Sequence, residues 1–245
     1  MSKNETGGGE GVEILEQKPF VSSTLRTDQT IRGIYTKKIY RLKSRVPYIL
    51  KKTFPDFAFV LHEESWNAYP YTKTVLTNPD YMKENFKVVV ESVHRTDSGT
   101  HENALNLTDL KNREVVFLDI ADDSFLKNTD HNNVQNFKST KTNRGPLLSG
   151  WSNHFDPLMT SYKVVSINFK WFGLQNQIEK IFHKNYAKLF VKFHRQMFCS
   201  IDKWHDLTLT EIRTFEKYIA AELKTQLQEG IPKSIQISDD EDDKK

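Results

Sequence analysis

The first residues that could carry out chemistry are His62, Glu63 and Glu64, which begin like a metal-binding pattern. The H-E-x-x-H pattern of a zinc hydrolase needs a second histidine four residues after the first, but Trp66 stands there. The chain also lacks a G-x-S-x-G sequence for a serine nucleophile. Its one cysteine, Cys199, lies in an apolar segment and is expected to be an inert core residue. We therefore expect no catalytic group, no cofactor and no metal, and a protein that is not an enzyme.

Binding chemistry is suggested instead by residues 62–81, HEESWNAYPYTKTVLTNPDY, where aromatic side chains alternate with Asn and Thr. Trp and Tyr supply apolar area with one polar group each, while Asn and Thr supply uncharged donors and acceptors. This mixture suits the wall of a cavity that must also hydrogen-bond its contents. An aromatic-rich strand pair in an ordinary core explains the same composition, and the stretch alone favours that simpler interpretation.

The composition limits the class of protein. The chain has 245 residues, 37% hydrophobic and 27% charged, which fits one large domain or two small ones. It has no run of about 18 apolar residues and no signal peptide, and one cysteine fits a reducing compartment. A net charge of +3 is too small to indicate nucleic-acid binding. We expect a cytoplasmic protein.

Alternating apolar residues predict the strands that would carry these side chains. The predicted strands are residues 34–42, 57–62, 71–77, 86–94, 115–120 and 161–171, the fifth of them short and buried. A short helix is expected at 44–53 and a loop at 121–151. Residues 1–33, with the TGGGEG sequence, read as a flexible connector because the P-loop ending is missing. Strands followed by helices predict an α+β domain with a mainly antiparallel sheet.

The second half is helical in pattern. From Leu174 apolar residues recur at helical spacing for 28 residues, about 42 Å, with Lys180, Lys184, Lys188, Lys192 and Arg195 on the other side. A second helix begins at Thr208, which can form a capping box with Glu211. It should turn Ile212, Phe215, Ile219 and Leu223 inward, and Gly230 and Pro232 should end it. We expect one domain at 1–232 and a disordered acidic tail at 233–245.

Several long blocks carry a family resemblance. They are WNAYPY, TVLTNPDYM, GIYTKKIYRL, KSTKTNRGPL, FKWFGLQNQIEK, FVKFHRQMFCSIDKW and LTLTEIRTFE, and they resemble the class I phosphatidylinositol transfer proteins. The resemblance implies a helix-grip fold, similar to the START domains, in which a curved sheet and a long C-terminal helix enclose one phospholipid. Relatives carry a first strand and most of a first helix before SKNETGGGEGVE, where this chain has only Met1. The expectation is that one sheet edge and its lipid contacts are missing.

The resemblance also implies a lipid head-group site. Thr36, Lys38, Asn67 and Glu216 match the positions that hold the inositol ring, and a ring of hydroxyls suits such donors and acceptors. From its strand position alone, Lys38 would be expected to extend into solvent. Three further residues match positions near the phosphate and a fourth a position near the choline of the alternative cargo, namely Thr74, Ser92, Lys163 and Phe193. Ser92 replaces a threonine that is common in relatives.

Two further features concern the surface. Trp171 and Phe172 match a membrane-docking pair that is usually two tryptophans in relatives, although a loop packed on its own domain would explain them equally simply. Ser139, in the basic segment KSTKTNR, matches a regulatory phosphorylation site, and a solvated basic loop is the alternative. Ser238 precedes DDEDD and suits an acid-directed kinase by composition alone.

The sequence therefore predicts a monomeric carrier that exchanges phosphatidylinositol for phosphatidylcholine between membranes, cytoplasmic and transiently bound to organelle surfaces. Three alternatives stay open. The protein could present phosphatidylinositol to lipid kinases without transporting it, or act as an enzyme on the same fold. It could also be a truncated form that cannot hold lipid.

Overall fold

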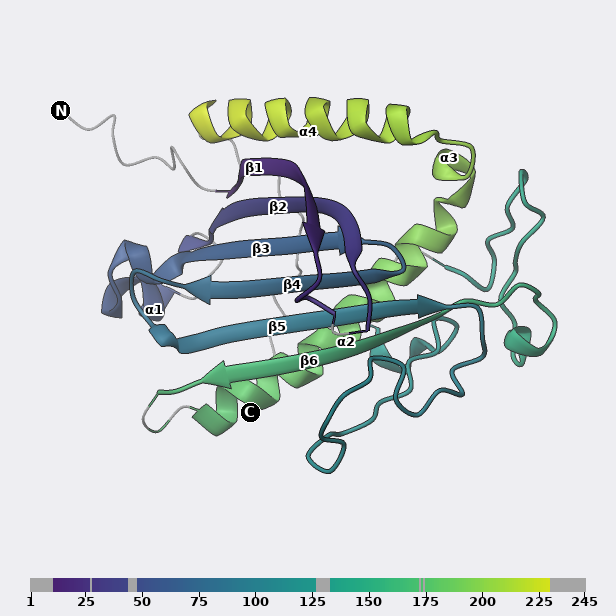
Figure 1. Ribbon diagram of the computed structural model, residues 1–245, viewed down its shortest axis with the longest axis horizontal. Coiled ribbons are helices and arrows are strands. Elements are labelled where there is room, and N and C mark those ends of the chain that lie inside the picture. Colours follow the sequence, from purple (N-terminus) through teal and green to yellow (C-terminus); the bar gives the residue numbers. More distant parts are fainter. Residues whose placement is uncertain are drawn as a thin grey trace. The chain divides into compact units, whose positions relative to one another are not determined.

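The computed structural model describes residues 11–26, 28–43, 48–126, 133–171, 173 and 175–229. Six strands form one sheet in sequence order, as Figure 1 shows. They are β1 (Gly11–Ser22), β2 (Ile31–Arg41), β3 (Val60–Ala68), β4 (Tyr71–Asn78), β5 (Lys83–Arg95) and β6 (Thr160–Phe169). The helices are α1 (Tyr48–Thr53), α2 (Gln175–Cys199), α3 (Ile201–Trp204) and α4 (Leu209–Glu229), with short 3-10 turns η2 (Asp56–Phe59), η3 (Asp123–Phe125) and η4 (Trp151–Asn153). The expected α+β class is confirmed.

The chain divides into two compact units. The first unit contains Met1–Trp66, Leu76–Glu84 and Arg213–Lys245, and the second contains Asn67–Val75 and Asn85–Ile212. The expected single domain at 1–232 stays a prediction, and the expected tail at 233–245 lies outside the described residues.

In the first unit, β1 pairs with β2 in an antiparallel ladder from Gly11 opposite Arg41 to Ser22 opposite Ile31. The expectation of a flexible connector over residues 1–33 is therefore wrong for this part of the chain. Pro19 argues against a strand because proline lacks the backbone N–H that a central strand position needs. It is tolerated here because β1 is an edge strand. Helix α4 runs alongside β1 (Figure 1), and a Cβ atom added to Gly11 would lie 3.6 Å from Leu227.

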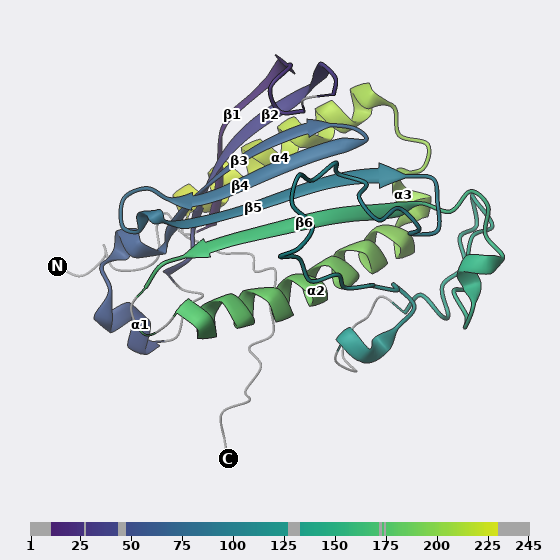
Figure 2. The same ribbon diagram turned by 60° about the horizontal axis from the view of Figure 1, so that its bottom comes forward.

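In the second unit, β5 pairs with β6 in an antiparallel ladder that places Ser92 directly opposite Lys163. Helix α2 runs along β6, as Figure 2 shows, and Phe182 of the helix packs on Phe86 of β5. Side chains opposite each other in such a ladder share a face. The face of β5 and β6 that carries Phe86 and Lys163 is therefore the face that α2 covers.

The segment between β5 and β6 corrects one prediction. Residues 115–120 were expected to form a short buried strand, but they form no strand, and Phe117 is 76% exposed. The carbonyl oxygen of Ile120 accepts a hydrogen bond from Arg195 Nε at 2.6 Å. The Ile120 carbonyl is thus hydrogen-bonded by a side chain of α2 and not by the backbone of a neighbouring strand.

Arg195 also departs from the helical pattern. It was expected on the solvent side of the long helix, yet it is 3% exposed and its guanidinium lies 2.7 Å from Asp123. The predicted 28-residue helix is interrupted as well, because α2 ends at Cys199 and α3 begins at Ile201. No helix in the described part of the chain is long and apolar enough to cross a membrane.

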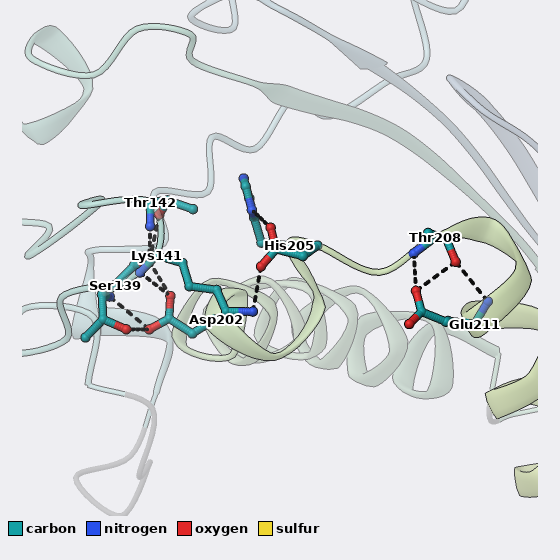
Figure 3. Close-up of polar contacts among 9 residues, drawn as sticks. Ser139, Lys141, Thr142, Asp202, His205, Thr208 and Glu211 are labelled. Atoms are coloured by element: carbon teal, nitrogen blue, oxygen red, sulfur yellow. Dashed lines mark hydrogen bonds and ion pairs between the residues drawn. The ribbon is translucent and has the colours of Figure 1, made fainter.

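The expected capping box at the start of α4 is confirmed (Figure 3). Thr208 Oγ1 accepts from the backbone N–H of Glu211 at 3.2 Å, and Glu211 Oε2 accepts from the backbone N–H of Thr208 at 2.8 Å. Phe215 was expected to face inward but is 61% exposed. The expected stop at Gly230 and Pro232 lies outside the described residues.

Because Thr208 caps the first turn of α4, Thr208→Ala should lower the free energy of unfolding by about 1 kcal/mol. Urea denaturation of the two proteins measures this difference. Thr225→Ala is the matched control, since the Thr225 hydroxyl bonds to the carbonyl of Ala221 within the same helix and Ala favours helix. Equal losses in the two variants would contradict a capping role.

Candidate functional site

A polar cluster in the first unit begins on β2. Lys38 Nζ lies 2.8 Å from Glu63 Oε1, and the Tyr40 hydroxyl donates to Glu63 Oε2 at 2.7 Å. Lys38 and Tyr40 are two positions apart on the strand, so both reach the same carboxylate from one face. Lys38 therefore has a partner within the protein, and it does not extend freely into solvent.

Helix α4 brings Glu216 to the same pair of strands. Arg213 donates to Glu216 Oε2 at 2.6 Å, and Gln17 Nε2 on β1 donates to the same oxygen at 3.4 Å. Gln17 lies directly opposite Thr36 in the β1–β2 ladder. Thr36, Lys38 and Glu216, which the family resemblance grouped, thus lie on strand β2 and helix α4 of one unit. Gln17 was missed because the strand that carries it was not predicted.

Asn67 is the fourth member of that predicted group. It lies on β3, is exposed, and belongs to the second unit. Its predicted role beside Thr36, Lys38 and Glu216 stays a prediction.

A second cluster lies between β5, β6 and α2. Lys163 Nζ donates to the hydroxyl of buried Ser92 at 3.3 Å and lies 5.1 Å from the ring centre of Phe190. Among the described residues, no carboxylate is within ion-pair distance of Lys163. Burial away from water lowers the pKa of this lysine. Ser92 and Lys163, predicted separately as phosphate-site residues, are therefore in contact, while predicted Thr74 lies half-buried on β4.

Two histidines lie in the same electrostatic environment. Burial, together with the charges of Lys163 and His94, lowers the pKa of His194 to about 4. Burial also lowers the pKa of His94, whose Nδ1 lies 3.2 Å from the carbonyl oxygen of Pro70. The His194 imidazole is therefore neutral near pH 7. Sequence reasoning missed them, because single histidines on a strand and a helix carry no spacing signal.

Exposed apolar side chains lie beside this cluster on α2. Leu189, Phe193 and Met197 follow one another at four-residue spacing on α2, and the first two are 54% and 52% exposed. At 100° per residue they share the arc of α2 that contains Phe190. Predicted Phe193 thus belongs to an exposed apolar stripe next to the Lys163 cluster.

The predicted docking pair follows β6. Trp171 is half-buried and borders a surface pocket of about 570 Å³, which among the described residues is also lined by Lys170, Gly173, Gln175 and Asn176. Phe172 lies outside the described residues. Docking by the two aromatic residues stays a prediction.

Ser139 lies in a polar network with α3, shown in Figure 3. The side chain is 2% exposed, and its hydroxyl donates to Asp202 Oδ1 and accepts from the backbone N–H of Thr142 at 2.9 Å. Asp202 also accepts from the backbone N–H groups of Thr140 and Lys141 at 2.9 and 3.1 Å. These hydrogen bonds, with that from Ser139 the strongest, hold the pKa of Asp202 well below its usual value.

The burial of Ser139 bears on its predicted phosphorylation. A kinase cannot reach a hydroxyl that is turned into this network, and a phosphate would lie against the carboxylate of Asp202. Phosphorylation would therefore require the segment around Ser139 to separate from α3. Modification of Ser139 stays a prediction, and Ser238 lies outside the described residues.

The described residues hold no group of three His, Cys, Asp or Glu side chains arranged for a metal ion. What they do hold is a polar cluster in each compact unit and, in the second unit, an exposed apolar face of α2 beside that unit's cluster. This defines an α+β protein whose polar groups suit binding.

Comparison with known proteins gives the family. The model of the phosphatidylinositol transfer protein family matches residues 1–221. The phosphatidylinositol transfer protein beta isoform of Bos taurus is 42% identical over 97% of this chain and 89% of its own length, and that of Homo sapiens gives the same values. Phosphatidylinositol transfer protein 1 of Dictyostelium discoideum is 39% identical over 93% of this chain and 86% of its own length. The chain belongs to the phosphatidylinositol transfer protein family.

The Asp202 network generates a test of local stability. Asp202→Asn should speed hydrogen exchange at the backbone amides of Thr140 and Lys141 by about tenfold or more, because hydrogen bonds to a charged acceptor are worth roughly 1.5–3 kcal/mol. NMR or mass spectrometry can measure the exchange rates.

Asp206→Asn is the matched control, because the Asp206 carboxylate pairs with the side chains of Lys141 and His205. It should leave the two amides nearly unchanged. Similar acceleration in both variants would show that the segment is not held by Asp202.

Proposed function

We propose that the protein carries one phospholipid at a time between membranes and exchanges phosphatidylinositol for phosphatidylcholine. The observation that carries this proposal is the Lys163 cluster beside the bare apolar stripe of α2. A cation with no carboxylate partner among the described residues suits an anionic group, and an apolar face suits hydrocarbon. A phospholipid has both in one molecule.

The energetics of transfer support a carrier. Each acyl CH₂ group exposed to water costs about 0.8 kcal/mol, so a diacyl lipid leaves a membrane and crosses water slowly. Apolar side chains such as Leu189 and Phe193 would replace the water around the acyl chains. The proposed fold is a helix-grip fold, similar to START domains, in which sheet and helix enclose the lipid.

The polar cluster of the first unit suits the inositol head group. Thr36, Lys38 and Glu216 offer a hydroxyl, an ammonium and a carboxylate, which can donate to and accept from ring hydroxyls. Lys38 forms an ion pair with Glu63, and Glu216 forms one with Arg213. Inositol would have to share or displace these partners, which favours a ligand with many hydroxyls over one with none. Asn67 is proposed as the fourth contact.

Choline offers no hydroxyl group, so phosphatidylcholine would depend on the phosphate contacts and on the apolar stripe. Thr74, Ser92 and Lys163 are proposed to hold the phosphate of either lipid, and Phe193 to pack near the choline. Release then takes place at a membrane, with Trp171 and Phe172 inserted at its surface. We propose a monomer that works in the cytoplasm and touches organelle membranes transiently.

Head-group selectivity tests the inositol assignment. Glu216→Ala or Asn67→Ala should weaken loading of phosphatidylinositol by about ten- to a hundredfold, since a lost hydrogen bond to a buried group is worth roughly 1–3 kcal/mol. Loading of phosphatidylcholine should stay nearly unchanged. The measurement is the ratio of the two lipids taken up from mixed vesicles, read by native mass spectrometry.

Glu222→Ala is the matched control for the helix, because Glu222 lies on α4 and its carboxylate accepts from Gln226. It should preserve the ratio. Parallel loss of both lipids in Glu216→Ala would refute a dedicated inositol site, and an empty parent protein would refute the carrier itself.

Membrane docking is tested by Trp171→Ala combined with Phe172→Ala. The double variant should stay folded and lipid-loaded but lose most of its transfer of phosphatidylinositol between vesicles that contain no kinase. Aromatic area is lost at the interface while the lipid contacts persist. Normal transfer by the double variant would mean that the pair is structural.

A further inference from the structure

We infer that His194 is a second ligand of the phosphate group beside Lys163, and that it takes up a proton when the phosphate binds. The protonated imidazole would donate its Nε2–H to a phosphate oxygen while Lys163 Nζ contacts another. This inference rests on the proposed function and adds to it a residue and a proton-linked step. The shared chemistry is a phosphate anion, from a phospholipid or from free phosphate.

The first support is a pair of unsatisfied polar atoms. Nε2 of His194 and Oγ of Ser161 are both shielded from solvent without a hydrogen-bond partner. Ser161 lies opposite His94 in the β5–β6 ladder, and Lys163 lies opposite Ser92 on the same face. Buried polar atoms in proteins are nearly always paired, so these two unpaired atoms, one on β6 and one on α2, indicate a missing partner. The groups present can all donate, so the missing partner is an acceptor.

The second support is the sign of the surrounding charges. Sheet and helix present Ser92 and His94 on β5, Ser161 and Lys163 on β6, and His194 on α2. The acids on neighbouring elements already have partners. Glu91, on the other face of β5, binds Lys73 and Tyr71. Asp97 accepts from Tyr162, Asp123 forms an ion pair with Arg195, and Asp202 accepts from Ser139.

These charges give a defined direction for proton linkage. Burial and the positive charge of Lys163 lower the pKa of His194 to about 4 in the lipid-free protein. An anion beside Lys163 offsets that charge and raises the pKa of His194 in the complex. A group whose pKa rises on binding makes binding tighter as the pH falls through the bound-state pKa. Lipid should therefore be held more tightly at pH 6 than at pH 8.

The experiment follows the imidazole directly. NMR titration of the ¹³Cε1–¹Hε1 signal of His194 from pH 5 to pH 8 should show an imidazole that stays neutral throughout in lipid-free protein and titrates above about pH 6 in phosphatidylcholine-loaded protein. The concentration of phosphatidylcholine or phosphatidylinositol vesicles that half-loads the protein should be several-fold lower at pH 6 than at pH 8. Both lipids should respond alike, because both carry the phosphate.

His194→Gln keeps an N–H donor but cannot titrate, so it should load at pH 8 and lose the pH dependence. His154→Gln is the matched control, because His154 is exposed in the same unit, and it should keep the parent's pH profile. An unchanged profile in His194→Gln, or an unchanged His194 pKa in the loaded protein, would overturn the inference.

Inorganic phosphate separates the two sources of the anion. A shift of the His194 signal with phosphatidylcholine, and a weaker one with millimolar phosphate, supports a lipid phosphate ligand. A shift with inorganic phosphate alone would overturn the assignment to lipid. A parent protein that takes up no lipid, as read by native mass spectrometry, would instead overturn the proposed function.

Discussion

The pairing of β5 with β6 is the constraint on which the second unit depends. The ladder sets Ser92 opposite Lys163, so a lysine ammonium lies on the sheet face that α2 covers. Partial removal of an ammonium from water is unfavourable unless an anion or several hydrogen bonds compensate. Ser92 supplies one hydrogen bond and Phe190 supplies a ring face. The remaining deficit is the physical reason for proposing an anionic ligand at this face.

The two polar clusters differ in how their charges are balanced. In the first unit, Glu63 neutralises Lys38 and Arg213 neutralises Glu216, so that cluster is complete without a ligand. In the second unit, Lys163 has no such partner among the described residues. A ligand of the first cluster must compete with internal ion pairs. A ligand of the second cluster would contact Lys163 without displacing a carboxylate of the described residues. This difference is why we propose the first cluster for head-group selectivity and the second for the phosphate common to all phospholipids.

The long segment between β5 and β6 is ordered by side chains from the C-terminal helices. Arg195 of α2 donates a hydrogen bond to the carbonyl of Ile120 and forms an ion pair with Asp123. Asp202 of α3 accepts hydrogen bonds from the Ser139 hydroxyl and from the backbone amides that follow it. Phe137 packs edge-on against Phe198 of α2 at 5.5 Å. A segment with little secondary structure of its own thus owes its conformation to residues about 60 to 75 positions away. Any event that moves α2 or α3 would also move Ser139.

The sequence by itself determined what is local or periodic. The capping box of Thr208 and Glu211 spans three residues, and the alternation that predicted a strand at 86–94 has a period of two, so neighbouring residues decide both. The family blocks grouped Thr36, Lys38 and Glu216 without any geometry. Only the tertiary structure decided that β1 is a strand, because an edge strand with Pro19 needs β2 to define it. It also decided that Arg195 is buried, that Phe117 is exposed, and that Lys163 and His194 share one environment. Burial, ion pairing and pKa are set by groups that lie far away in the chain and meet only after folding.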